Sequence, residues 1–310
     1  MRAIGLHTFG GPDVLQVIDL PDVHAGPGEV RIRVHAATVN PTDLVLRNGA
    51  RAEQMKADPP PYVPGMDVAG VVDEVGAGVG GFKVGDAVMG VVSPKGSQGA
   101  YREQIVLDAK SVAHAPQGKS HVEAATLPMN SLTARLSLDL LGLKPGQVLA
   151  VTGAAGAYGG YVIQLAKQDG LTVVADAAET DEALIKSLGA DIVVRRGDDV
   201  AARFRECFPQ GVDGLADGAV LNEKALPAVR DGGAYTAVRG FSGSERDIRS
   251  TPTFVRNYVQ EGGKLDRLRQ QVEDGEITLR VAEVYAPERA ADAHRRLEAG
   301  GVRGRLVIQF

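Results

Sequence analysis

The stretch that decides the fold is residues 147–167, which read QVLAVTGAAGAYGGYVIQLAK. A short apolar run, Val148 to Val151, leads into a turn made almost wholly of glycine and alanine. The turn opens into a segment whose apolar residues recur at helical spacing, so the stretch predicts a strand, a tight turn and a helix. The start of such a helix carries unpaired N–H groups and partial positive charge, which favour an anion such as a pyrophosphate.

The turn has the spacing of the dinucleotide-binding fingerprint GxGxxG, with alanine in the first glycine place. A second apolar run ends at Asp176, close to the roughly 20-residue offset at which an acid binds the adenosine ribose. We therefore expect the turn to bind a nucleotide, with the N–H groups of residues 156–159 facing the pyrophosphate. The alternative is a strand–helix turn without a ligand. The expected contacts are Gly153, Ala154, Ala155, Gly156, Ala157, Tyr158 and Gly159.

Length and composition are typical of a globular protein with two domains. The chain has 310 residues, of which 44% are hydrophobic and 24% charged. A net charge of −5 gives no indication of a nucleic-acid partner. No apolar run reaches the ~18–20 residues needed to span a membrane, and the first residues carry no targeting signature. We expect a cytoplasmic protein with no membrane partner.

The single cysteine, Cys207, excludes an internal disulfide and any zinc site with two or more thiolates. It lies at the end of an expected helix, where a surface role is more common than a catalytic one.

Residues 1–118 read as β-rich. Glu29 to Ala36 alternates polar and apolar residues with period two, which predicts a half-buried strand. Further strands are expected at 68–75 and 86–91, separated by Gly- and Pro-rich turns. Many short strands with such turns favour a compact, barrel-like domain.

From about residue 119, apolar runs alternate with helical stretches, which predicts a doubly wound α/β domain with a parallel sheet. A last helix is expected at 287–298 and a last strand at 304–310. Thr180 is the expected N-cap of the second helix. The expected strands are 148–152, 172–175, 191–194, 212–216 and 234–238, and the helices are 159–168, 181–188, 198–206 and 222–230.

A series of short motifs runs along the chain: Val39 to Asp43, Pro64 to Gly70, Gly85 to Val88, Ala124 to Pro128, Leu132 to Ala134, the turn at 153–160, and Leu188 to Asp191. In this order and spacing they resemble the zinc-free medium-chain dehydrogenase/reductases of the quinone oxidoreductase group along nearly the whole chain. The resemblance implies a β-rich, GroES-like catalytic domain of residues 1–118 and 265–310 around a Rossmann-type domain of residues 119–264, with the active site in the cleft between them.

The resemblance also bears on metal. In zinc-dependent relatives, catalytic ligands sit where this chain has Asn40 and Met66, and neither an amide nor a thioether suits a zinc site built for thiolate and imidazole. The cysteine-rich structural-zinc loop is absent too. We therefore expect no zinc, and NAD(P)H-dependent reduction of a quinone by direct hydride transfer. The alternatives are an enoyl or enone reductase and, in another class, a nucleotide-binding module without turnover.

By resemblance, Asn40 lines the active cleft, with Thr42 beside it; N-capping of the next helix is the alternative for both. Val45 stands where some relatives carry a tyrosine, so an acid is missing there. Asn130 and Thr133 should precede a helix that faces the nicotinamide, unless they are simple caps. The last expected contacts, with the carboxamide, come from a loop that could also be an ordinary glycine turn: Arg239, Gly240 and Phe241.

Cofactor choice depends on two residues. Asp176 would hold the ribose hydroxyls and repel a 2′-phosphate, which favours NADH. By resemblance, Arg196 reaches the adenosine end, so NADPH stays possible. Tyr158 departs from the small residue usual in the family, and its ring should lie along the cofactor groove or point outward. The resemblance further implies a homodimer in which the strand at 234–238 and its neighbours pair across a two-fold axis.

Overall fold

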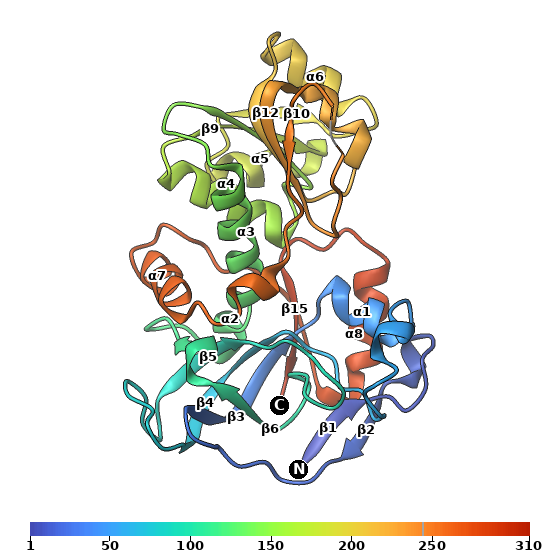
Figure 1. The fold of residues 1–310 in the computed structure, drawn as a ribbon, viewed down its shortest axis with the longest axis vertical. Coiled ribbons are helices and arrows are strands. Elements are labelled where there is room, and N and C mark those ends of the chain that lie inside the picture. Colours follow the sequence, from blue (N-terminus) through green and yellow to red (C-terminus); the bar gives the residue numbers. More distant parts are fainter. Residues whose placement is uncertain (244) are drawn as a thin grey trace. The chain divides into compact units, whose positions relative to one another are not determined.

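The computed structural model describes residues 1–243 and 245–310, and contacts divide the chain into two compact units. The first unit holds residues 1–129, 259–274 and 279–310, and the second holds 130–258 and 275–278 (Figure 1). The short return to the second unit is anchored by a hydrogen bond from the Thr278 N–H to Gln164 Oε1 at 2.8 Å. These changes of unit lie some residues away from the expected domain boundaries at 118 and 264, which stay a prediction.

The second unit contains a parallel sheet of six strands in the order β10-β9-β8-β11-β12-β13. The central strands are buried apolar runs, because a parallel sheet is covered on both faces. The doubly wound fold is therefore confirmed. The strands are β8 (Val148–Thr152), β9 (Thr172–Ala177), β10 (Ile192–Arg195), β11 (Val212–Asp217), β12 (Val229–Ala237) and β13 (Arg249–Ser250).

Helices α4 (Ala157–Gln168), α5 (Glu182–Ser187) and α6 (Val200–Cys207) confirm three of the expected helices. The helix expected at 222–230 is wrong. Two short 3₁₀ turns, Asn222–Lys224 and Leu226–Ala228, stand there, since Pro227 cannot donate an interior helical hydrogen bond.

Two expected helix starts also need correction. Thr180 is not a cap, because α5 begins after a 3₁₀ turn with Asp181 at its N-cap. Asn130 and Thr133 do not precede a helix but lie inside α3 (Pro128–Leu141).

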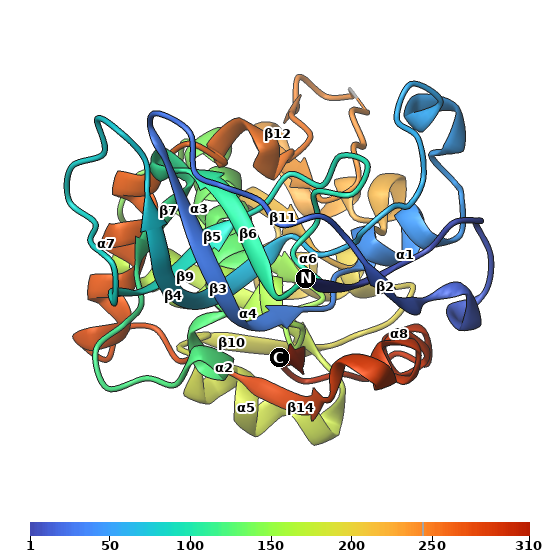
Figure 2. The same cartoon turned by 90° about the horizontal axis from the view of Figure 1, so that it is seen from below.

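The first unit has a two-stranded sheet of β1 (Arg2–Gly5) and β2 (Gln16–Asp19), and a larger sheet built around the long strand β3 (Glu29–Thr38). Figure 2 shows β3 alongside β4 and β6, and β15 pairs with its C-terminal part. The N-terminal and C-terminal parts of the chain thus share one sheet. Its other strands are β4 (Asp67–Val75), β5 (Ala87–Val91), β6 (Gln104–Asp108), β7 (Val112–His114), β14 (Val281–Tyr285) and β15 (Arg305–Gln309).

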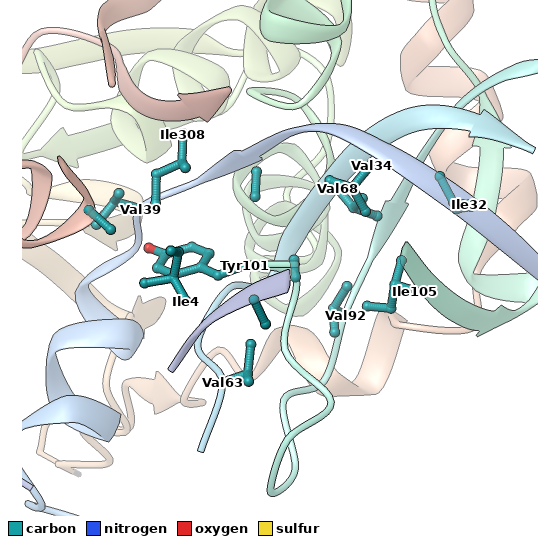
Figure 3. Close-up of a cluster of buried hydrophobic side chains, with 14 of the residues drawn as sticks. Ile4, Ile32, Val34, Val39, Val63, Val68, Val92, Tyr101, Ile105 and Ile308 are labelled. Atoms are coloured by element: carbon teal, nitrogen blue, oxygen red, sulfur yellow. The ribbon is translucent and has the colours of Figure 1, made fainter. Parts of the chain in front are cut away.

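One apolar core fills the first unit, and Tyr101 is fully buried within it. Figure 3 shows the Tyr101 ring in this cluster beside Ile4, with side chains from β3, β4 and β15 around it. Helices were expected after residue 40 and residue 287, and both are present, whereas the helix at 262–273 was not expected. The helices are α1 (Pro41–Arg47), α2 (His121–Ala124), α7 (Gly262–Glu273) and α8 (Ala290–Glu298).

Candidate dinucleotide site and buried polar clusters

The glycine-rich turn joins β8 to α4 and is closely packed against its own backbone. Gly153 has φ +64°, a conformation that L side chains rarely adopt. A Cβ on Gly159 would lie 2.5 Å from the Gly153 carbonyl oxygen and 2.6 Å from Ala154 Cα. The helix can therefore start this close to the strand only with glycine at residue 159.

Not every N–H group of the turn is available to an anion. The Gly156 N–H, which we expected to face the pyrophosphate, donates to the Gly153 carbonyl at 3.0 Å and closes the turn. Ala157, Tyr158 and Gly159 are the first three residues of α4, so their N–H groups have no carbonyl partner within the helix. These three remain the candidates for phosphate contact.

Asp176 lies near the end of β9 and is brought to the turn, as the spacing predicts. Its Oδ1 accepts the Ala154 N–H at 3.1 Å, and only 7% of the residue is exposed. Burial raises the pKa of Asp176, while the Ala154 N–H and the nearby Arg196 charge favour the carboxylate. The acid thus holds the turn, and its contact with an adenosine ribose stays a prediction.

Arg196 follows β10, the strand that pairs with β9. Its backbone N–H donates to the Ala177 carbonyl at 2.8 Å, which fixes it one residue beyond the sheet. Within residues 1–243 and 245–310, the exposed Arg196 guanidinium makes no hydrogen bond or ion pair, whereas Arg195 pairs with Glu179 at 3.1 Å. An unpaired cation therefore lies at the same sheet edge as Asp176.

The Tyr158 ring does not point outward, and its place along the cofactor groove stays a prediction. Its hydroxyl donates to Ser137 Oγ of α3 at 2.8 Å, so the ring is directed into the second unit. A Cβ on Gly218 would lie 2.8 Å from Tyr158 Cδ1, so the ring packs directly against the segment after β11. The tyrosine fits here because residue 218 has no side chain.

The loop after β12 is conformationally unusual. Arg239 has φ +73° and Gly240 φ +91°, and a non-glycine residue in this region is uncommon. The Phe241 ring packs edge-on against Tyr235, with ring centres 5.6 Å apart. The Phe241 side chain thus belongs to the core of the second unit, which leaves the backbone of the loop for the expected carboxamide contact.

Asn40 is the N-cap of α1 and is fully buried in a polar cluster of the first unit. Its Oδ1 accepts from Arg305 Nη2 at 2.7 Å, and its Nδ2 donates to Asp67 Oδ2 at 3.0 Å. Strand pairing thus brings a buried ion pair against both polar atoms of the amide. That Asn40 lines the active cleft stays a prediction. Asp67 also accepts the Met129 N–H, at 2.6 Å.

Thr42 is half-buried, and its hydroxyl donates to the Met66 sulfur at 2.9 Å. A hydroxyl has one proton to donate, and Thr42 directs it at the sulfur, a weak acceptor, rather than along a relay. In the part of the chain that the structure describes, no group of three or more His, Cys, Asp or Glu side chains could hold a metal ion.

A second buried cluster runs through Asp43, Tyr101 and His294. The Tyr101 hydroxyl donates to Asp43 Oδ2 at 3.2 Å and lies 3.2 Å from His294 Nε2. Burial raises the pKa of Asp43 to about 7 and, with the nearby Arg47 cation, lowers the pKa of His294 to about 3. A neutral His294 with its proton on Nε2 therefore donates to Tyr101 and leaves Nδ1 for Arg47, 3.5 Å away.

Sequence reasoning missed these clusters. Asp67 and Arg305 lie 238 residues apart in the chain, and Tyr101 and His294 lie 193 apart. No spacing rule links such pairs; only the pairing of β3 with β4 and β15 brings the first pair together. A charged residue directly before an apolar run, as Arg305 is before Leu306 to Ile308, was the one available signal.

Among the described residues, no helix is long and apolar enough to span a bilayer.

Comparison with known proteins agrees with this geometry. Residues 26–117 match the family described as Alcohol dehydrogenase GroES-like domain, and residues 188–308 match Zinc-binding dehydrogenase. The chain is 33% identical to the 2-methylene-furan-3-one reductase of Solanum lycopersicum, with 99% of this chain and 79% of the relative covered. The same identity and coverage hold for the chloroplastic NADPH-dependent alkenal/one oxidoreductase of Arabidopsis thaliana.

Among solved structures, the quinone oxidoreductase from Coxiella burnetii superposes with a TM-score of 0.88 at 28% identity, covering 100% of this chain and 99% of that one. The family matches, the relatives that cover 99% of this chain and the structural superposition thus indicate the same family. The chain therefore belongs to the medium-chain dehydrogenase/reductase superfamily of NAD(P)H-dependent oxidoreductases.

Proposed function

We propose that this oxidoreductase reduces quinones by direct hydride transfer from a nicotinamide cofactor, without a metal ion. The observation that carries the proposal is the β8–α4 turn. There the N–H groups of Ala157, Tyr158 and Gly159 open a helix, and Asp176 hydrogen bonds to Ala154 at 3.1 Å. When bound, the cofactor would supply the hydride, and the protein would position the acceptor and exclude water.

The residues in the zinc-ligand places do not fit the metal. The Asn40 oxygen faces the Arg305 guanidinium at 2.7 Å, and a dication placed beside a fixed cation would be repelled. The Met66 sulfur already accepts the Thr42 hydroxyl. Amide and thioether groups are in any case poor ligands for a catalytic zinc ion.

Among the described side chains, neither Thr42 nor Val45 is a ready proton donor, which favours a quinone as acceptor. Hydride addition to a quinone gives a hydroquinone anion, a stabilised phenolate that takes its proton from water. The Thr42 hydroxyl directs its proton at the Met66 sulfur, and Val45 carries no acid. Asn40 and Thr42 would then shape the pocket wall without acting as acid or base.

Reduction of a conjugated enone is the second candidate, and the names of the two plant relatives favour it. Both reactions use the same hydride donor and differ in the acceptor. In enone reduction, hydride addition to the β-carbon gives an enolate, and the α-carbon of that enolate must then be protonated. That reaction therefore depends more on solvent access.

For the cofactor, we propose NADH as the preferred donor, because the Asp176 carboxylate would lie against a 2′-phosphate. The unpaired Arg196 guanidinium is the group that would admit NADPH. Asn130, Thr133 and the backbone of residues 239–241 are the proposed contacts of the nicotinamide end.

The test measures oxidation of NADH and NADPH by chelator-treated protein with 1,4-benzoquinone, a simple enone and an enoyl-CoA in parallel. Quinone turnover that survives the chelator supports the proposal. Turnover with the enone or enoyl-CoA alone would transfer it to the second candidate. Tight cofactor binding with no acceptor reduced would instead identify a binding module without turnover.

Homodimer formation and a cytoplasmic location stay predictions. β13 pairs with β12 at Ala234 and Tyr235 and, in the described chain, is the last strand of this sheet, so β13 is the neighbour of the strand at 234–238 that would pair across a two-fold axis. The name of the Arabidopsis relative places that protein in the chloroplast. Sedimentation analysis of the purified chain would give the oligomeric state directly.

A further inference from the structure

Four hydroxyl groups form a continuous hydrogen-bonded row inside the second unit. Tyr158 Oη lies 2.8 Å from Ser137 Oγ, which lies 2.9 Å from Thr253 Oγ1. Thr253 Oγ1 lies 2.6 Å from Thr236 Oγ1, and Thr236 Oγ1 lies 2.7 Å from the Thr251 carbonyl oxygen. Ser137 and Thr236 are fully buried, and Thr253 is 5% exposed.

The carbonyl at the end of the row fixes the direction of every hydrogen bond in it. A carbonyl only accepts, so Thr236 donates its one proton to Thr251. Thr253 must then donate to Thr236, Ser137 to Thr253, and Tyr158 to Ser137. Burial raises the pKa of Tyr158, so its proton stays in place. Hydrogen bonds that all run in one direction polarise one another, so each bond in the row is strengthened by its neighbours.

Tyr158, at one end of the row, and Thr253, within it, lie at the two places where the cofactor is proposed to bind. Tyr158 is the second residue of α4, in the proposed pyrophosphate turn. Thr253 forms a parallel bridge with Val238, and its N–H donates to Ala237 at 3.1 Å, directly before the loop that starts with Arg239. That loop is the proposed carboxamide contact.

We propose that Tyr158 is a positioning residue that ties the pyrophosphate turn to the nicotinamide loop through Ser137 and Thr253, an inference that rests on the proposed cofactor site. The row holds two binding segments of one ligand at a fixed separation. Arg239, at φ +73°, needs such outside support to keep its conformation.

Loss of the Tyr158 hydroxyl should slow hydride transfer more than it weakens binding. Phosphate contact comes from backbone N–H groups, and Tyr158→Phe keeps them. The nicotinamide end loses its fixed position, and small misplacements at the reacting atoms lower rates strongly. We expect kcat to fall about tenfold, with less than a roughly threefold change in the KM for NADH.

The experiment compares Tyr158→Phe with Tyr285→Phe, which removes a different tyrosine hydrogen bond, to Glu283 at 2.5 Å in the first unit. The readouts are kcat, the KM for NADH and the isotope effect on kcat with NADH deuterated at nicotinamide C4. Tyr158→Phe should raise the isotope effect, because hydride transfer becomes more rate-limiting, and Tyr285→Phe should leave all three values unchanged.

Thr253 supplies a second, independent test within the row. Thr253→Val keeps the shape and removes the hydroxyl, and it should reproduce the effect of Tyr158→Phe. Thr253→Ser keeps the hydroxyl and should restore parent kinetics. The double variant Tyr158→Phe/Thr253→Val should be no worse than either single variant, since one break interrupts the row.

The outcomes separate this inference from the proposed function. Parent protein that oxidises neither NADH nor NADPH overturns both. Parent turnover with an unchanged isotope effect in Tyr158→Phe and Thr253→Val overturns the positioning role alone. A tenfold rise of the KM for NADH in Tyr158→Phe, without a fall in kcat, would make Tyr158 a plain binding residue and would also overturn the positioning role.

Discussion

Arg305 Nη2 lies 2.8 Å from Asp67 Oδ2, in an ion pair whose side chains are 4% and 0% exposed. Desolvating two charges is costly, so such a pair persists only where further hydrogen bonds satisfy it. Here Asp67 also accepts from Thr38, Asn40 and the Met129 N–H. The pair therefore connects β15, β4 and the start of α3, far apart in the sequence.

Breaking this pair should be strongly destabilising. Arg305→Met or Asp67→Asn would leave one buried charge without its partner, which costs about 3–5 kcal/mol of unfolding free energy. Urea unfolding gives the value. The control is Lys119→Met, which removes an ion pair with both side chains more than a third exposed and should cost less than ~1 kcal/mol. Equal losses in the buried and exposed variants would contradict the expectation.

Gly159 and Gly156 form a matched pair in the proposed pyrophosphate turn. A Cβ on Gly159 would lie 2.5 Å from the Gly153 oxygen, whereas one on Gly156 would lie 3.1 Å from the same atom. Gly159→Ala should therefore cost about 1–3 kcal/mol of stability and raise the KM for NADH severalfold. Gly156→Ala should change both much less. Thermal unfolding and cofactor titration of the two variants check this, and a larger effect at Gly156 would refute it.

The second unit could be predicted from sequence because its strands are buried on both faces and read as apolar runs. The expected strand at 148–152 matches β8, and that at 212–216 falls within β11. The helix predicted at 222–230 is wrong because the composition favours a helix but two residues interrupt it. Asn222 adopts φ +54°, and Pro227 follows five residues later, so only 3₁₀ turns form.

The same physics limits what could be predicted of the site. The turn and Asp176 are linked by a fixed offset along one β-α-β unit, so spacing alone finds them. Asn40 was found but its partners Asp67 and Arg305 were not, because they reach it only through strand pairing. The Tyr158 orientation depends on Gly218 and Ser137, which no local pattern connects to the turn.

Cofactor preference should respond to charge at the sheet edge. Asp176→Asn keeps an oxygen for the Ala154 N–H and removes the negative charge. One unit charge at ~4 Å in water is worth about 1 kcal/mol, so the NADPH-to-NADH ratio of kcat/KM should rise roughly fivefold. Arg196→Gln should lower the ratio by a similar factor. Steady-state kinetics with both cofactors decide this, and an unchanged ratio in both variants would remove these residues from cofactor selection.

Asp43 and His294 should give opposite pH dependences of stability. The Asp43 pKa is raised by burial from 3.8 to about 7, so the folded state binds the extra proton and stability falls as pH rises through that window. The His294 pKa is lowered from 6.5 to about 3, mainly by burial, so the unfolded state binds the extra proton and stability rises with pH. Between about pH 4 and 6.5 the two slopes of unfolding free energy against pH are therefore opposite and cancel.

Single variants should uncover each contribution. Asp43→Asn leaves only the His294 contribution, so its unfolding free energy should rise with pH relative to the parent, by up to about 1.4 kcal/mol per pH unit. His294→Gln leaves only the Asp43 contribution and should fall relative to the parent over the same range. Every other titrating group is common to the three proteins, so differences between their urea-unfolding profiles isolate the pair. Parallel profiles would mean that neither group changes its protonation on folding.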